Sequence, residues 1–168
     1  MLAKEGCNII ISDIDECKVR EVANSYQVKT VAPDTLDLDM DIYAPCALGA
    51  TLNHTTIPKL KCKIIAGGAN NQLEDENLHA LMLQEQGILY APDFVINSGG
   101  ITNVYLEYQG NYNKDLAYRH VEGIYDVCLD LLENAERDKI TTHQAALKMA
   151  TDRISAIEKL KTSLTTKD

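Results

Sequence analysis

The chain has 168 residues and a formal net charge of −9, with 45% hydrophobic and 24% charged residues. These values predict one globular domain with room for a buried core, and the acidic balance disfavours a general binder of nucleic-acid phosphates. No apolar run approaches the roughly 20 residues that a membrane span needs, and the first residues lack the apolar core of a signal peptide.

The first part of the chain alternates helical and extended segments. Residues 1–6 are predicted to be the last turn of a helix that Gly6 ends, and the β-rich run from Asn8 to Ser12 predicts a strand that stops at Asp13. Apolar residues at helical spacing then predict a helix from Glu16 to Tyr26, and a weaker strand follows at Lys29 to Val31.

The middle of the chain continues this alternation with short, continuously apolar strands. These strands are expected at Ile42 to Ala44, at Ile64 to Ala66 and at Ile88 to Tyr90. Pro45 interrupts the first of them, which is expected to continue from Cys46 to Gly49. Thr56 is placed to cap a short turn that contains Pro58, and a helix is expected from Leu73 to Gln86. The apolar face of that helix comprises Leu73, Leu78, Leu81 and Met82. Continuous apolar strands between helices are typical of a mostly parallel sheet with both faces covered.

After residue 100 the strands stop and helices follow. A polar loop is expected after the last strand, and a helix begins over Gly100 to Glu107. A long second helix is predicted from Leu116 to Arg137. Thr141 and Gln144 have the spacing of a capping box and open a third helix.

Small or polar residues follow several of these strands, at the ends where open α/β sheets bind ligands. Asp13 follows the first strand, where an acidic side chain can accept the two hydroxyls of an adenosine ribose. The others are Ala47, Leu48 and Gly49 after the strand at 42–44, Asn70 and Asn71 after the strand at 64–66, and Asn97, Gly99 and Gly100 after the strand at 88–90. Glycines at a strand-to-helix junction let backbone N–H groups approach a ligand closely. Together these residues favour a dinucleotide cleft.

Each of these residues has a plainer explanation when taken alone. Asp13 could cap the helix that follows it, Asn70 and Asn71 could form a turn, and a glycine pair is common in loops. Their recurrence at corresponding strand ends makes the dinucleotide cleft the leading hypothesis.

One expected part of a dinucleotide fold is missing, because the glycine-rich loop G-x-G-x-x-G does not occur in the sequence. The chain begins where that loop and its helix would have just ended. The predicted fold is therefore α/β, a Rossmann-type doubly wound and mostly parallel sheet that is incomplete at its N-terminus and is followed by C-terminal helices. Residues 1–112 would form the partial dinucleotide-binding domain, and residues 113–168 the helices that pack on it.

Several longer segments carry a family resemblance. They are Tyr43–Gly49 (YAPCALG), Thr56–Lys61 (TIPKLK), Ile64–Leu73 (IIAGGANNQL) and Tyr90–Gly100 (YAPDFVINSGG). These segments closely resemble the Glu/Leu/Phe/Val amino-acid dehydrogenases, the leucine type above all, and the resemblance extends over nearly the whole chain. It implies an NAD-dependent enzyme, a homo-oligomer, that reversibly deaminates an L-amino acid to its 2-oxo acid and ammonia.

The resemblance also implies roles for individual residues. Asp13 matches the acid that binds the ribose, and Ala47 and Leu48 match residues beside the cofactor. Asn70 and Asn71 match an amide-bearing turn near nicotinamide. Asn97 matches the asparagine of an Asn-Ala-Gly-Gly motif, in which Ser98 here replaces the alanine. Ile101 and Val104, three apart on one helix face, match positions that line the pocket for the substrate side chain. An aliphatic pair there favours a branched aliphatic amino acid, because a charged side chain would be desolvated without a partner. Ordinary helix packing is the alternative for this pair.

The family's catalytic lysines and aspartate lie on a separate N-terminal substrate domain, and no segment of this chain resembles it. The resemblance therefore implies that no residue here is the general base and that the isolated chain does not turn over amino acids. The chain would be the cofactor half of a dehydrogenase, as a fragment or a truncated reading frame. Two other hypotheses stay open: a non-enzymatic module that binds a nucleotide or pairs with full-length subunits, and a 2-hydroxy-acid dehydrogenase with His54 as its catalytic histidine.

The cysteines and histidines do not predict a metal site. The five cysteines are scattered without a C-x-x-C pair, and the four histidines lack ligand spacing. Such scattered cysteines are typical of reduced thiols in a cytoplasmic protein. The expected cofactor is NAD, and the expected partner is a small aliphatic L-amino acid rather than a nucleic acid or a membrane.

Overall fold

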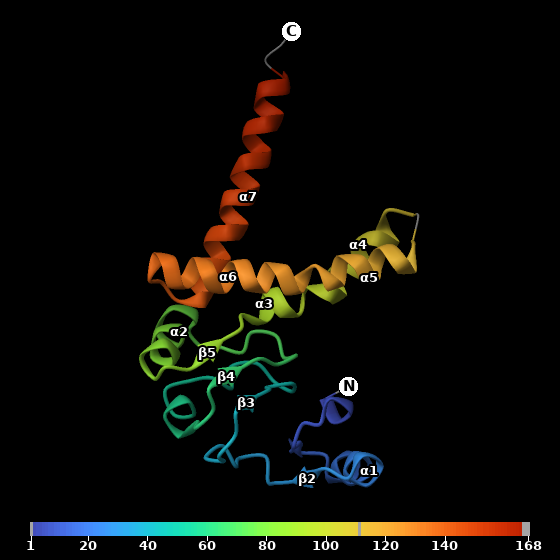
Figure 1. Ribbon diagram of the computed structural model, residues 1–168, viewed down its shortest axis with the longest axis vertical. Coiled ribbons are helices and arrows are strands. Elements are labelled where there is room, and N and C mark those ends of the chain that lie inside the picture. The colour runs from blue at the N-terminus through green and yellow to red at the C-terminus, as the bar shows by residue number, and fades with distance from the viewer. Residues whose placement is uncertain (1, 111, 166–168) are drawn as a thin grey trace. The chain divides into compact units, whose positions relative to one another are not determined.

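The computed structural model describes residues 2–110 and 112–165, with side chains as far as residue 160 (Figure 1). The chain forms two compact units, Met1–Leu38 and Asp39–Asp168. The strand pairs of both units are parallel, as the alternation of apolar strands and helices predicts. Within the described residues, no helix is both long enough and apolar enough to cross a membrane.

The first unit contains one short ladder and one helix. It comprises the 3₁₀ turn η1 (Leu2–Glu5), strand β1 (Ile10–Ile11), helix α1 (Glu16–Tyr26) and strand β2 (Lys29–Thr30). β1 pairs with β2, and Ile10 lies opposite Lys29. Asp15 caps α1, because its carboxylate accepts hydrogen bonds from the N–H groups of Cys17 and Lys18 at 3.1 and 3.2 Å. The predicted elements are confirmed, although both strands are shorter than expected.

Residues 2–38 contain no buried side chain. The apolar stripe of α1 leaves Val22 and Tyr26 40% and 63% exposed. The start of α1 therefore depends on its cap, and its apolar stripe is not sealed into a core of this unit.

The second unit is built on a three-stranded parallel sheet. Its strands are β3 (Ile42–Tyr43), β4 (Ile64–Ile65) and β5 (Leu89–Tyr90), in the order β3-β4-β5. Ile65 is fully buried, and it lies opposite Tyr43 on one side and Tyr90 on the other. These strands lie where the apolar runs predict them.

The continuation of β3 predicted from Cys46 to Gly49 is wrong. β4 ends at Ile65, so the ladder offers no partner beyond the hydrogen bond from the N–H of Ala66 to the carbonyl of Tyr43 at 3.0 Å. Past this point the chain after β4 bends into a loop, and the two segments meet through loop contacts instead of a ladder.

The short turn after β3 begins where expected but is held differently. η2 (Ile57–Lys59) follows Thr56, whose hydroxyl makes no capping bond. It donates to the carbonyl of Thr51 at 2.6 Å and accepts from the N–H of Asn53 at 3.0 Å. The Thr56 hydroxyl therefore holds the chain that leads into the turn.

Helix α2 (Glu76–Glu85) begins later than predicted, because Asp75 caps it with hydrogen bonds to two N–H groups of its first turn. This start sets the buried face, which comprises His79, Ala80 and Leu83. Leu78 and Leu81, expected on the apolar face, are 53% and 44% exposed. Leu73 precedes the helix and is buried in the loop before it.

Helices follow the sheet, and two predictions about them need correction. They are α3 (Asp93–Ile96), α4 (Ser98–Tyr108), α5 (Lys114–Glu122), α6 (Ile124–Asp138) and α7 (Thr142–Thr165). The expected polar loop after β5 contains α3. The expected helix from Leu116 to Arg137 is two helices that meet at Gly123, since glycine is a poor helix former. The capping box is confirmed: Thr141 Oγ1 accepts from Gln144 N–H at 3.1 Å, and Gln144 Oε1 accepts from Thr141 N–H at 3.2 Å.

Helices α6 and α7 share a core and cover one edge of the sheet. Leu131 and Ala135 of α6 pack with Ala145 and Ala146 of α7. α6 also contacts α3, and α7 contacts α2 and β5 (Figure 1). These contacts fix β5 and α3, which carry much of the candidate site.

The end of α6 is tied to α7 through Asp138, which gives a prediction about acid stability. Its carboxylate lies 2.8 Å from Nε of Arg137 and 2.6 Å from Nζ of Lys148, and the hydrogen bonds to these two side chains lower the pKa of Asp138 to about 2. The unfolded value is about 3.9, so the stabilisation is present above about pH 4 and is lost as the pH falls through about 2. Asp138→Asn is therefore expected to lower the melting temperature at about pH 6 by a few degrees, and the difference from the unsubstituted chain should vanish near pH 2.

Thermal melts followed by circular dichroism at several pH values test this expectation. Asp41→Asn is the matched control, because the ion pair of Asp41 with Lys63 is 81–85% exposed and should contribute little. A difference between Asp138→Asn and the unsubstituted chain that stays constant down to about pH 2 would contradict the assignment.

Candidate functional site

The loops after β3 and β4 meet at the carboxyl edge of the sheet. The N–H of Ala50 donates to the carbonyl of Asn71 at 2.7 Å, and the N–H of Gly68 donates to Sγ of Cys46 at 3.4 Å. The N–H of Ala69 donates to the carbonyl of Pro45 at 2.9 Å. Two parallel strands end at the same edge of a sheet, and a connection of about a dozen or more residues must separate them in the sequence. These contacts therefore join segments that are more than 20 residues apart.

Two glycines allow the loops to approach this closely. A Cβ added to Gly49 would lie 2.9 Å from the backbone oxygens of both Asn70 and Asn71. A Cβ on Gly67 would overlap the backbone of Pro45. The absence of a side chain at both positions therefore shapes the edge of the sheet.

The side chain of Asn97 is hydrogen-bonded to the loop after β4. It lies between α3 and α4, and its side-chain Nδ2 donates to the carbonyls of Gly68 and Ala69 at 3.0 and 3.2 Å and to Oδ1 of Asn70 at 3.1 Å. The structure thus brings together Asn70 and Asn97, which the sequence analysis placed at neighbouring strand ends.

The contact between the two amides leaves one donor and one acceptor for a ligand. Because Asn70 uses Oδ1 to accept from Asn97, its Nδ2 group remains, and because Asn97 uses Nδ2 inward, its Oδ1 remains. No described residue bonds either of these two atoms. A neighbouring donor and acceptor match a primary carboxamide, which offers the same two groups in return.

Asn71 continues the turn in an unusual backbone conformation. Its φ is 52°, in the left-handed region that asparagine tolerates better than most residues. Its N–H donates to Oδ2 of Asp93 at 2.6 Å, and Oδ1 of Asp93 accepts from the hydroxyl of Tyr90 at 3.0 Å. The turn that the sequence analysis offered as the plainer alternative for Asn70 and Asn71 is therefore present, and it belongs to a larger network.

Asp93 is the residue of this site that sequence reasoning missed. It is only 8% exposed and Tyr90 only 2%. Burial, and then the charge of Asp93, raise the pKa of Tyr90, so the phenol stays protonated and donates. The available signal was a lone carboxylate between Pro92 and an apolar run, which must be paired if it is buried.

The apolar members of the predicted site are exposed. Leu48 is 72% exposed and Ala47 is also exposed, in the loop after β3. Ile101 and Val104 are 68% and 56% exposed on α4, so ordinary helix packing does not bury them. Ser98, which stands where the family motif has alanine, donates its hydroxyl to the carbonyl of Val95 at 2.7 Å.

Asp13 lies in the first unit and is exposed just after β1. Its carboxylate accepts a hydrogen bond from the N–H of Asp15 at 2.9 Å. Asp15, not Asp13, caps α1, so the capping alternative for Asp13 is wrong. The other carboxylate oxygen of Asp13 is free of hydrogen bonds to the described residues.

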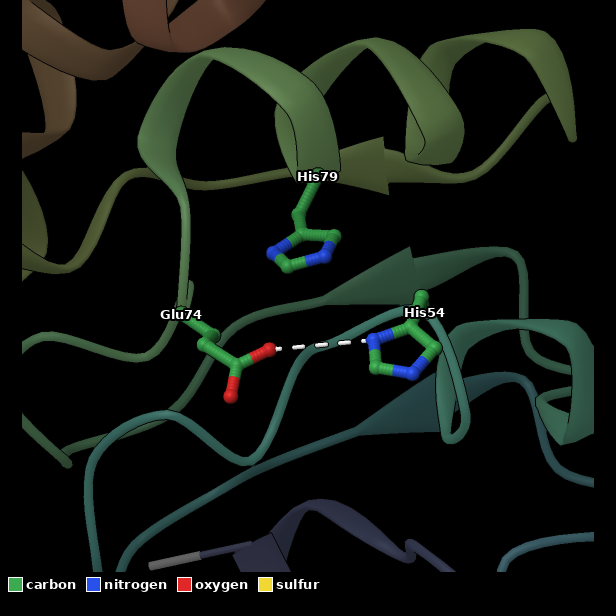
Figure 2. Close-up of side chains that lie close together, drawn as sticks. All are labelled: His54, Glu74 and His79. Carbon is green, nitrogen blue, oxygen red and sulfur yellow. Dashed lines mark ion pairs between the residues drawn. The ribbon is translucent and has the colours of Figure 1, made fainter.

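A second group of titratable side chains comes together outside the predicted site. Figure 2 shows His54, Glu74 and His79, whose potential ligand atoms all lie within 4.8 Å of one another. Nδ1 of His54 is 3.9 Å from Oε2 of Glu74, and both side chains are mostly exposed. Sequence spacing did not reveal this group, because His54 lies between β3 and β4 while Glu74 precedes α2 and His79 lies within it.

The bonding of His79 limits what this group can hold. Its Nδ1 accepts a hydrogen bond from the N–H of Asp75 at 2.9 Å, so the proton of the neutral ring sits on Nε2. Neither nitrogen of His79 then has a free lone pair for a metal ion. His54 and Glu74 alone would make an incomplete, solvent-exposed site.

Comparison of the sequence with models of known families identifies the family of this chain. A family model described as glutamate/leucine/phenylalanine/valine dehydrogenase matches residues 4–161. The chain belongs to this dehydrogenase family. Membership confirms the resemblance read from the sequence motifs.

Individual relatives cover nearly all of this chain. The leucine dehydrogenase of Thermoactinomyces intermedius is 46% identical over 96% of the chain, and the L-tryptophan dehydrogenase of Nostoc punctiforme is 47% identical over 92%. The crystal structure of the latter dehydrogenase superposes with a TM-score of 0.90 over 94% of the chain. A phenylalanine dehydrogenase of Caldalkalibacillus thermarum is 36% identical over 91%. The matches cover only 42–47% of these relatives, so the chain spans less than half of their length.

The close approach at Gly67 gives a testable expectation. Gly67→Ala should destabilise the chain by on the order of 1–3 kcal/mol, because a methyl group cannot be placed without moving Pro45. Gly100→Ala is the matched control, since nothing lies within 4 Å of its added Cβ and it stands in α4. Urea unfolding measures both; equal midpoints for the two variants would contradict the packing described for these loops.

Proposed function

We propose that this chain supplies the nicotinamide end of a cofactor site in an NAD-dependent L-amino-acid dehydrogenase of the leucine type, which reversibly deaminates its substrate to the 2-oxo acid and ammonia. The observation that carries the proposal is the pair of free amide groups, Nδ2 of Asn70 and Oδ1 of Asn97, at the sheet edge of a chain of this family. NAD bears a primary carboxamide on its nicotinamide ring, and that group requires one donor and one acceptor.

The other residues at the sheet edge have roles in the same proposal. Ala47 and Leu48 lie beside the cofactor and give it an apolar surface, and Asn71 sets the turn that carries Asn70. The carboxylate of Asp13 accepts hydrogen bonds from the ribose hydroxyls of the adenosine. Residues 1–112 form the nucleotide-binding part and residues 113–168 the helices that cover it. NAD held by these residues would supply the acceptor for the hydride that leaves the α-carbon of the amino acid.

The substrate proposed is an L-amino acid with a branched aliphatic side chain. Ile101 and Val104 present an exposed apolar surface on α4, which suits such a side chain and not a charged one. The relatives are named for leucine, tryptophan and phenylalanine, all with apolar side chains, which supports an apolar pocket. The aliphatic choice rests on the identity of these two residues.

The catalytic acid and base are proposed to lie outside this chain. The segments that form the sheet edge, residues 44–53, 66–73 and 90–104, contain no lysine, and their only carboxylate is that of Asp93. Asp93 is buried and accepts two hydrogen bonds, so it is not free to take a proton from a substrate. The chain alone is therefore proposed to be inactive. A cytoplasmic location, supported by five unbridged cysteines, and a homo-oligomeric assembly complete the proposal.

A hybrid enzyme tests this proposal. Residues 1–168 replace the matching segment of the Thermoactinomyces intermedius leucine dehydrogenase, and the appearance of NADH is followed with leucine, phenylalanine and tryptophan as substrates. The hybrid is expected to turn over leucine fastest, and residues 1–168 alone are expected to show no turnover. A folded hybrid that uses none of the three amino acids would overturn the function, and turnover by residues 1–168 alone would overturn the placement of the catalytic base.

The role of the amide pair is tested in the same hybrid. Asn70→Ala removes the proposed donor to the carboxamide and should raise the KM for NAD about 10-fold, the effect of one hydrogen bond worth roughly 1.4 kcal/mol. Asn77→Ala on the exposed surface of α2 is the matched control and should leave that KM unchanged. Equal KM values for the two variants would contradict the assignment of Asn70.

A further inference from the structure

Two donors from different segments converge on one buried carboxylate at the candidate site. Oδ2 of Asp93 accepts from the backbone N–H of Asn71 at 2.6 Å, and Oδ1 accepts from the hydroxyl of Tyr90 at 3.0 Å. Asp93 is the first residue of α3, and Tyr90 is the last residue of β5. Both partners donate here, and an ionised carboxylate accepts at either of its oxygens.

The bond from Asn71 fixes the peptide plane that carries Asn70. The N–H of Asn71 and the carbonyl of Asn70 belong to the same peptide group, so Asp93 sets the orientation of both. On its other side, the carbonyl of Asn71 accepts from the N–H of Ala50 at 2.7 Å. With both of its backbone groups bonded, Asn71 is held at a φ of 52°, which costs an ordinary residue conformational energy.

The side chain of Asn70 leaves the chain next to this fixed peptide. Its Oδ1 is held by Nδ2 of Asn97, so its free Nδ2 group points in a direction that two contacts determine together. One contact is the amide of Asn97, and the other is the turn that Asp93 holds. Loss of either would let Asn70 reorient.

We propose that Asp93 is a positioning residue of this site: its buried carboxylate holds the Asn70–Asn71 turn so that Nδ2 of Asn70 is aimed at the carboxamide of the nicotinamide ring. The inference rests on the function proposed above, and it adds a residue that does not itself touch the cofactor. Asp93 acts through Asn71 and Asn70, and Tyr90 supports it by donating to the second carboxylate oxygen.

Asp93→Asn is the direct test, because an amide keeps the size of the side chain but replaces the charged acceptor of the Asn71 N–H with a neutral one, which makes a weaker hydrogen bond. Binding of NADH and of ADP-ribose to the 168-residue chain is measured by calorimetry. ADP-ribose lacks the nicotinamide ring and so does not depend on Asn70. Asp93→Asn is expected to weaken NADH binding about fivefold and to leave ADP-ribose binding within about twofold, since the hydrogen bond that is weakened acts at the nicotinamide end only. Asp130→Asn, the same change at an exposed carboxylate of α6, should alter neither.

The outcomes separate the inference from the proposed function. Equal weakening of both ligands, or unchanged NADH binding, would show a merely structural role or none for Asp93 and would overturn the inference. If the unsubstituted chain binds ADP-ribose and NADH equally well, it makes no use of the nicotinamide ring, which overturns the proposed nicotinamide site itself and with it this inference.

A second variant keeps the inference testable if Asp93→Asn does not fold. Tyr90→Phe removes one donor to Asp93 and leaves Asn71 bonded, so its effect on NADH should be smaller, about threefold, with ADP-ribose again unaffected. Hydrogen exchange of the Asn71 amide should be faster in Tyr90→Phe than in the unsubstituted chain. An unchanged exchange rate together with unchanged NADH binding would overturn the inference.

Discussion

The carboxylate of Asp93 joins the end of β5 to the loop after β4, and the edge of the sheet depends on that bond. Each strand of the β3-β4-β5 sheet has only two residues in the ladder, so the ladder alone determines little of what lies beyond it. A buried carboxylate is costly unless it is hydrogen-bonded, which means that Asp93 must keep its two donors whenever the unit is folded. The same requirement holds Tyr90 and Asn71 in place.

Small residues and amides complete this edge around the carboxylate. Gly49 and Gly67 let the loops after β3 and β4 touch backbone to backbone, and Asn97 ties them to the junction of α3 and α4. The helices α6 and α7 then hold α3 and β5 from the other side through a small core of leucine and alanine. The free amide groups of Asn70 and Asn97 therefore lie on a framework of hydrogen-bonded loops, which suits the cofactor site proposed for them.

Local signals in the sequence predicted most of the helices and strands, and the misses include both a local helix cap and contacts between residues far apart in the sequence. Helix α1 and the start of α7 follow from periodicity and a capping box, which operate within a few residues. The late start of α2 depends on Asp75 as its cap, and that start turns Leu78 and Leu81 outward. The pairing of Asn70 with Asn97 was expected only as proximity. The bond from the N–H of Asn71 to Asp93 was not expected at all, because these two residues lie 22 positions apart in the sequence.

Asn70 and Asn97 are proposed to receive the carboxamide of a nicotinamide ring. NMR of the ¹⁵N-labelled chain during titration with NADH follows the side-chain amide signals of both residues. The signals of Asn70 and Asn97 are expected to shift with NADH, while the side-chain amide of Asn77 on α2 should not. NADH binding that leaves both signals unmoved, with the shifts confined to other residues, would contradict the proposal.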